Sequence, residues 1–275
     1  MARKGLIRVA GFVVLLFTMA GCLEVSTVVS VKPDGTGTVA ERILMSKASF
    51  GQMNSLTEGG KKGPAGQMPD KAALEKKSLE IGEGVRFISV RPVVTKTHEG
   101  YEALYAFRDI NLLQLNRNPD SGVSADSASG DQAPKKKKQY VHFTFKEGTP
   151  SRLVIVMDQE KEAGSFSSSA AAKPQQNAEQ LKMVTSIMKQ FLKGMRVFMA
   201  VDIDGTILGT NATHRKEKRI TLIDVDFDKL LANPKQFASF TALGSDPSSK
   251  EMQKIFKNIP GIKLETQKEV ELSFQ

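Results

Sequence analysis

The sequence predicts an α+β domain built on a large, mostly antiparallel β-sheet of hairpins and a meander, with a few amphipathic helices on one face. Most patterned segments place apolar residues at every second position and are joined by short turn signals. Helical spacing of apolar residues is confined to a few blocks, which is typical of α+β domains. With 40% hydrophobic and 25% charged residues in 275 positions, the chain is neither a multi-pass membrane protein nor wholly disordered.

The first part of the chain predicts two hairpins. Every second residue from 25 to 31 is Val or Thr, the turn signal Pro33-Asp34-Gly35 follows, and residues 36–45 form the returning strand. Residues 85–95 and 101–107 flank a second turn in the same way. Both pairs are expected to be antiparallel because only a few residues separate their strands.

The rest of the chain continues the strand pattern. Further strands are predicted over residues 141–145, 153–157, 196–203, 206–212, 219–225 and 262–274. The three between 196 and 225 are joined by short turns and therefore predict a three-strand meander.

Helices are fewer, and the clearest spans residues 178–193. Its apolar face includes Met183, Ile187 and Phe191, which are the candidate apolar ligand face. Methionine adapts to varied acyl chains, and ordinary packing against the sheet is the alternative. Further helices are predicted over residues 48–56, 72–79, 227–240 and 247–259.

The N-terminus carries an export signal over residues 1–21. A basic stretch precedes the apolar run 9–17, which ends in Met19-Ala20-Gly21-Cys22 around the only cysteine of the chain. This segment resembles the bacterial lipoprotein signal, with the last four residues as the lipobox. The alternative is an uncleaved anchor with an incidental cysteine.

The lipoprotein resemblance implies cleavage after Gly21 and a diacylglyceryl thioether on Cys22, leaving residues 22–275 as one exported domain. Acyl chains would hold this domain on a membrane, since each buried methylene contributes about 0.8 kcal/mol. Leu23 follows the cysteine, which by the same resemblance favours the periplasmic face of the outer membrane if the source has two membranes.

Three segments are predicted to be disordered loops within that domain, at residues 58–69, 116–139 and 160–174. The second ends in a basic run that is the candidate contact with an anionic surface: Lys135, Lys136, Lys137 and Lys138. Each lysine near an anionic membrane contributes about 1 kcal/mol; a solubilising loop is the alternative. A nucleic-acid partner is not expected, because no aromatic residues are interleaved with the basic run.

One motif resembles a catalytic one. Val201-Asp202-Ile203-Asp204-Gly205-Thr206 is similar to the first motif of haloacid-dehalogenase-type phosphatases, in which the first aspartate is the nucleophile. That family places the motif on a parallel sheet, whereas a strand is predicted directly after Thr206. We interpret Asp204-Gly205 as a hairpin turn and Asp202 as a solvated strand residue. No catalytic residue, metal site or cofactor is expected.

Residues 22 to about 115 resemble the LppM-like domain of bacterial lipoproteins. The resemblance lies in the cysteine, the strand Leu23–Val31 that follows it, and the turn and return over residues 32–39. That family is linked to envelope lipid or lipoglycan binding, so the resemblance implies a similar role. The C-terminal membrane helix common in the family has no counterpart here.

These observations predict a membrane-anchored envelope lipoprotein whose domain binds lipid or another amphiphile without catalysis. A structural or assembly protein that binds another envelope protein is the alternative, and a phosphatase is the third. A filled core between the sheet and its helices would favour the assembly role over a lipid carrier.

Overall fold

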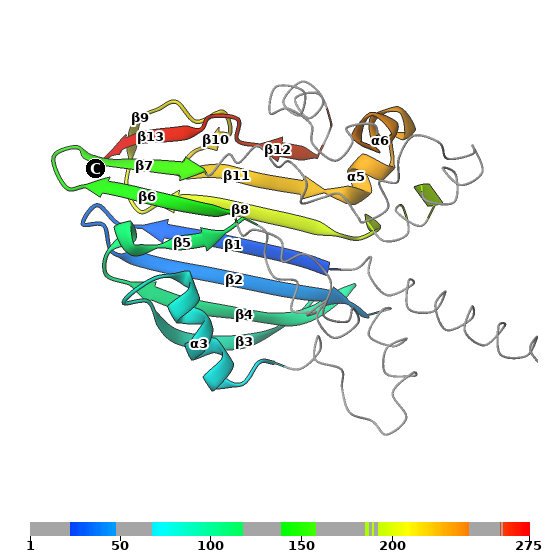
Figure 1. Ribbon diagram of the computed structural model, residues 1–275, viewed down its shortest axis with the longest axis horizontal. Helices are drawn as coiled ribbons and strands as arrows, with labels where there is room; N and C mark the ends of the chain where they lie inside the picture. Colours follow the sequence, from blue (N-terminus) through cyan, green and yellow to red (C-terminus); the bar gives the residue numbers. More distant parts are fainter. Residues whose placement is uncertain are drawn as a thin grey trace, which may run out of the picture.

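The computed structural model describes residues 23–47, 68–117, 139–157, 185, 186, 189, 192–241, 259 and 261–275. They form two β-sheets with few helices (Figure 1), so the α+β, strand-rich class is confirmed. Within this part of the chain, no helix is long and apolar enough to cross a membrane.

The larger sheet has eight strands in the order β10-β11-β8-β1-β2-β4-β3, with β12 paired to β11. Its strands are β1 (Leu23–Val31), β2 (Gly37–Ser46), β3 (Arg86–Val94), β4 (His98–Phe107), β8 (Arg196–Ile203), β10 (Arg215–Lys216), β11 (Arg219–Asp226) and β12 (Ile262–Leu264). The β1–β2 and β3–β4 hairpins confirm the predicted pairs. Strands β1 and β8 pair in parallel, which the sequence pattern did not indicate.

The smaller sheet has five strands in the order β5-β6-β7-β13-β9, all antiparallel. They are β5 (Gln114–Asn116), β6 (Tyr140–Lys146), β7 (Ser151–Met157), β13 (Glu269–Phe274) and β9 (Ile207–Thr210). Figure 1 shows this sheet in front of β1, β8 and β11, with α3 (Lys71–Ile81) continuing the same layer over β4 and β3.

Among the described residues, further short helices are η2 (Ile110–Leu112), α5 (Phe227–Leu231) and α6 (Pro234–Thr241). Helix α3 covers the predicted 72–79 segment, and α5 and α6 together cover the predicted 227–240 segment. Helix α3 begins where the Asp70 side chain accepts a hydrogen bond from the Ala73 amide at 2.7 Å, as an N-cap does. It buries Leu74, Ser78 and Ile81 against the layer below.

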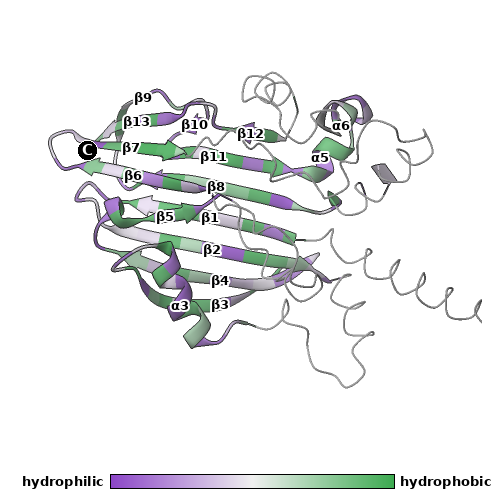
Figure 2. Cartoon of the chain, in the orientation of Figure 1, coloured by the Kyte–Doolittle hydropathy of each residue, from purple (hydrophilic) through white to green (hydrophobic). Residues whose placement is uncertain are grey.

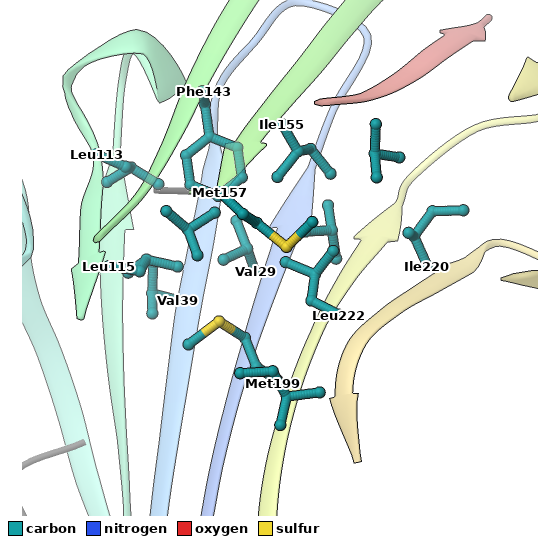
Figure 3. Packing of buried hydrophobic residues seen from close by; sticks show 14 of the residues in the cluster. Val29, Val39, Leu113, Leu115, Phe143, Ile155, Met157, Met199, Ile220 and Leu222 are labelled. Carbon is teal, nitrogen blue, oxygen red and sulfur yellow. The ribbon is translucent and has the colours of Figure 1, made fainter. Parts of the chain in front are cut away.

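The core fills the space between the two sheets. On β1, Val25, Thr27, Val29 and Val31 are at most 6% exposed, while the residues between them are half-buried on the opposite face. Figure 3 shows side chains of both sheets pointing toward one another. Its labelled residues from the two sheets are Val29, Val39, Met199, Ile220 and Leu222, and Leu115, Phe143, Ile155 and Met157.

The predicted meander is wrong. Strand β8 pairs directly with β11, and β9 lies in the smaller sheet. The predicted hairpin turn at Asp204-Gly205 is instead a corner: the Asp204 amide donates to the Val31 carbonyl and the Thr206 amide donates to the Gln275 carbonyl, both at 2.7 Å. A side chain on Gly205 would collide with that Gln275 carbonyl, so glycine permits the close approach at which the chain changes sheets.

The predicted strand 262–274 also divides between the sheets, into β12 and β13. Glu265, which is 7% exposed, lies at that division. Its carboxylate accepts hydrogen bonds from the amide and hydroxyl of Thr213, at 2.8 and 2.7 Å. Thr213 lies between β9 and β10, where the chain returns from the smaller to the larger sheet. The Glu265 carboxylate therefore connects two segments at which the chain passes from one sheet to the other.

Candidate functional site

The outer face of the larger sheet carries its polar side chains in rows across the strands. The register places Thr38, Ser30, Asp202 and Arg219 side by side on β2, β1, β8 and β11. Their neighbours Val29, Val31, Val39 and Ile203 are buried on the inner face. Because side chains alternate along a strand, this row points away from the core.

A pocket of about 650 Å³ opens over this row, and all four of its residues line the pocket. Its charged lining residues are four cations, Lys32, Lys216, Lys218 and Arg219, and three carboxylates, Asp202, Asp204 and Glu217. Ser30 and Thr38 contribute hydroxyl groups. The pocket volume falls in the range of sites that hold small ligands, roughly 300–1,000 Å³.

Arg219 and Asp202 form the best-defined pair in the pocket. The Arg219 Nε and Nη2 atoms donate to the two carboxylate oxygens of Asp202, each at 2.6 Å. The hydrogen bond to Asp202 raises the pKa of Arg219. Since these two charges cancel, the three lysines face only Asp204 and Glu217, and the pocket is left with one excess positive charge.

The Arg219 guanidinium also packs against an aromatic ring on the neighbouring strand β8. It lies 5.7 Å from the ring centre of Phe198, and Arg196 lies 5.9 Å from the same ring. Arg196 is in turn hydrogen bonded to Asp224 at 3.1 Å. Each contact of this kind contributes about 0.5–1 kcal/mol at an exposed site, so Arg219 forms a fixed wall of the pocket.

The β10–β11 hairpin supplies Lys216 and Lys218. Lys216 pairs with Arg219 across a two-residue turn, in which Glu217 has a φ of 53°. The Lys218 carbonyl accepts a hydrogen bond from the Ile203 amide at 2.9 Å, which docks the hairpin tip on the end of β8. The basic residues between 215 and 219 therefore lie on a hairpin that is fixed beside Asp202.

Lys32 enters the pocket from the β1–β2 turn. Its amide donates to the Thr36 carbonyl at 2.9 Å, closing the turn. The Asp34 carboxylate accepts from the Thr36 amide and hydroxyl at 3.0 and 2.8 Å, and these hydrogen bonds lower the pKa of Asp34. The turn thus holds Lys32 at the rim of the pocket through backbone contacts.

Several predicted site residues lie outside the described residues. These are Cys22, Lys135, Lys136, Lys137, Lys138, Met183, Ile187 and Phe191. Both motif aspartates, Asp202 and Asp204, do line the pocket. Met199, which follows the predicted helix 178–193 in the sequence, is 3% exposed and belongs to the core.

The pocket could not be predicted from the sequence, because the residues that line it are far apart in the chain. Lys32 belongs to the turn after β1, whereas Lys216 and Lys218 belong to the β10–β11 hairpin near the other end of the chain. The parallel β1–β8 pairing, which places Ser30 opposite Asp202, brings them together. A period-two pattern indicates which face of a strand is buried, but it does not indicate which other strand lies beside it in the sheet.

No group of three or more His, Cys, Asp or Glu side chains in the described part of the chain could hold a metal ion. Asp226 caps α5, accepting from the Lys229 amide at 3.3 Å. Asp228 accepts from the Gly194 amide at 2.7 Å.

Comparisons with known proteins place few constraints on the chain. No protein-family model matches it, and no curated protein matches it in sequence. One solved structure is similar, the NMR structure of the folded domain of Mycobacterium tuberculosis LppM, at 10% identity over 74% of this chain and 82% of that one. Its TM-score is 0.31, so this distant resemblance assigns neither a family nor a function.

Proposed function

We propose that the chain is a membrane-anchored envelope lipoprotein whose domain binds, without catalysis, an amphiphile with an anionic head group. The observation that carries the proposal is the outer-face pocket, in which Lys32, Lys216 and Lys218 exceed the remaining carboxylates. All three lysines are exposed, and each contributes about 1 kcal/mol near an anionic lipid surface. The lipobox around Cys22 supports the anchored location.

An apolar row beside the pocket supports an amphiphilic ligand. The register places Val28, Ala40, Leu104 and Ala200 side by side, one row further along the outer face than Ser30 and its neighbours. Three of them are half-buried and Ala200 is buried. A head group bound by the lysines would leave the first part of its acyl chain over the half-buried Val28, Ala40 and Leu104 side chains.

The geometry around Asp202 favours binding over phosphoryl chemistry. Both carboxylate oxygens of Asp202 are engaged by Arg219 at 2.6 Å, whereas a nucleophilic carboxylate needs an oxygen free to attack. Asp204 lies in the corner between two sheets that are antiparallel except for β1–β8. Turnover of a generic phosphoester with Mg²⁺, lost in Asp202→Asn, would overturn the non-catalytic proposal.

Binding another envelope protein is the second candidate. The packed core between the two sheets favours it over a carrier that holds its lipid inside the domain, and one surface favours it as well. Strand β3 lies at an edge of the larger sheet, and its Ile88 and Val94 side chains are 53% and 68% exposed. Exposed apolar side chains on an edge strand are typical of docking sites. Site-specific photocrosslinking from position 88 in cells distinguishes this role, because a lipid-binding domain gives no defined protein adduct there.

The proposal is tested on the domain without its anchor, residues 23–275. Native mass spectrometry with organic extraction should reveal a co-purifying lipid, and calorimetry should show binding of dihexanoyl phosphatidylglycerol and little binding of the phosphatidylcholine equivalent. Lys216→Glu with Lys218→Glu should weaken that binding by roughly tenfold or more, since about 1.4 kcal/mol corresponds to tenfold.

A matched charge reversal controls for net charge. Lys71 and Lys76 are exposed on α3, away from the pocket, so Lys71→Glu with Lys76→Glu should leave binding unchanged. Equal affinity of all three proteins for the anionic lipid would contradict the proposal.

A further inference from the structure

We infer that the pocket takes its anionic group from outside the membrane that anchors the chain, because the anchor and the pocket lie at opposite ends of the domain. This inference rests on the proposed function and adds where the ligand comes from. The ligand chemistry is a phosphate-type oxyanion on an amphiphile, presented either by a facing membrane or by a lipid dispersed in the aqueous space.

Strand β1 sets the distance between the two ends. It begins at Leu23, the residue after the lipobox cysteine, and ends at Val31, the residue before Lys32. Figure 1 shows β1 running from one end of the larger sheet to the other. At about 3.3 Å per residue, the eight steps from Leu23 to Val31 place the pocket about 26 Å from the anchor end.

No tether separates the anchor from the sheet. Leu23 already pairs with Met45, and Glu24 pairs with both Leu44 and Arg196. A lipid on the preceding residue would therefore hold this end of the sheet directly against the bilayer. The domain cannot swing on a flexible linker as it could if a polar spacer followed the cysteine.

The anchor end has its own membrane-compatible surface. The register continues from Leu23 through Met45 and Glu99 to Val94, which is 68% exposed. Lys47 and Lys96 are exposed at the same end, and the Lys47 Nζ atom donates to the Thr95 carbonyl at 2.6 Å. These lysines, and not those of the pocket, are placed to meet anionic head groups of the anchoring membrane.

The opposite end gathers hydrophilic turns. The β1–β2 turn, the β6–β7 turn and the C-terminus lie together at the left of Figure 1, where Figure 2 shows mainly hydrophilic turns. The surface potential of the anchoring membrane decays over about 8 Å at physiological ionic strength. It therefore falls through several decay lengths before reaching Lys216 and Lys218.

The test uses the mature lipidated chain inserted in phosphatidylcholine vesicles. Labelled vesicles containing phosphatidylglycerol are added from outside, and energy transfer between the two vesicle populations reports bridging. We expect the wild-type chain to bridge the two vesicle populations. The variant Lys216→Glu with Lys218→Glu should lose bridging. The matched control Lys47→Glu with Lys96→Glu, which reverses two charges at the anchor end, should bridge as the wild type does. Phosphatidylglycerol placed in the anchoring vesicles should not compete.

The second arm separates the two sources of the ligand. Dihexanoyl phosphatidylglycerol, which stays dispersed, should bind the anchored chain and block bridging if both reach the same pocket. Binding of the dispersed lipid without bridging assigns the dispersed source and still supports the inference.

Two other outcomes contradict different claims. If phosphatidylglycerol in the anchoring vesicles abolishes binding of both added probes, the pocket faces its own membrane and the inference is wrong. If the soluble domain binds no anionic lipid in calorimetry, the proposed function itself fails.

Discussion

The two faces of the eight-stranded sheet use neighbouring residues of the same strands for different purposes. On the inner face Val29 and Val31 are fully buried, whereas Val28 and Ser30, which alternate with them along β1, are half-buried on the outer face. The inner face packs against the smaller sheet and α3; the outer face carries ion pairs and the pocket. Stability and recognition should therefore respond to different substitutions on the same strands.

The largest predicted effect compares two phenylalanines on opposite faces. Phe107 of β4 is 3% exposed in the core, so Phe107→Ala should lower the free energy of unfolding by about 3–5 kcal/mol. Phe198 is half-buried between two arginines on the outer face, and Phe198→Ala should cost about 1 kcal/mol. Urea unfolding of both variants measures the difference; equal losses would break the distinction between the faces.

Alkaline pH should act on the inner face through its tyrosines. Burial, with a smaller contribution from Glu41, raises the pKa of Tyr101 to about 12 and also raises that of Tyr105. Unfolded tyrosines ionise near 10. The stabilisation is therefore complete below pH 10 and lost as the pH rises toward 12, by on the order of 2 kcal/mol for Tyr101.

Chemical denaturation at pH 9 to 12 checks this dependence. Other groups also titrate in this range, so the control is the variant Tyr101→Phe with Tyr105→Phe. Its free energy of unfolding should fall less steeply with pH than that of the wild type. Parallel curves would show that the tyrosines do not cause the loss.

The smallest effect should come from Tyr105 itself near neutral pH. Its hydroxyl is buried without a hydrogen-bond partner among the described residues, and the side chain has no exposed surface. A buried polar group without a partner costs about 1–3 kcal/mol, so Tyr105→Phe should leave the protein equally stable or stabilise it by up to about 1 kcal/mol. A clear loss of thermal stability would mean that the hydroxyl has a partner, such as a buried water.

The sequence was informative wherever local chemistry decides the structure. The turn signal at Pro33-Asp34-Gly35 predicted the β1–β2 hairpin, and the pattern at 72–79 predicted α3. The second sheet escaped prediction because β9 and β13 alternate as strands of one sheet would. Only the close approach of Gly205 to the Gln275 carbonyl marks the change of sheet.

The pocket depended even more on long-range pairing. The turn after Val31 and the aspartate motif were visible in the sequence as separate patterns, and the basic residues 215–219 lie in a third segment. Their meeting at one end of the outer face follows from the parallel pairing of β1 with β8, which no local pattern specifies.

The most direct test of the account is to map lipid binding on the domain by NMR, titrating dihexanoyl phosphatidylglycerol into labelled residues 23–275. The account predicts that amide shifts change at Lys32 and from Lys216 to Arg219, with smaller changes at Val28 and Ala40. Changes centred on Val29, Met157 and Met199 would contradict it, because they would place the lipid between the two sheets and not on the outer face.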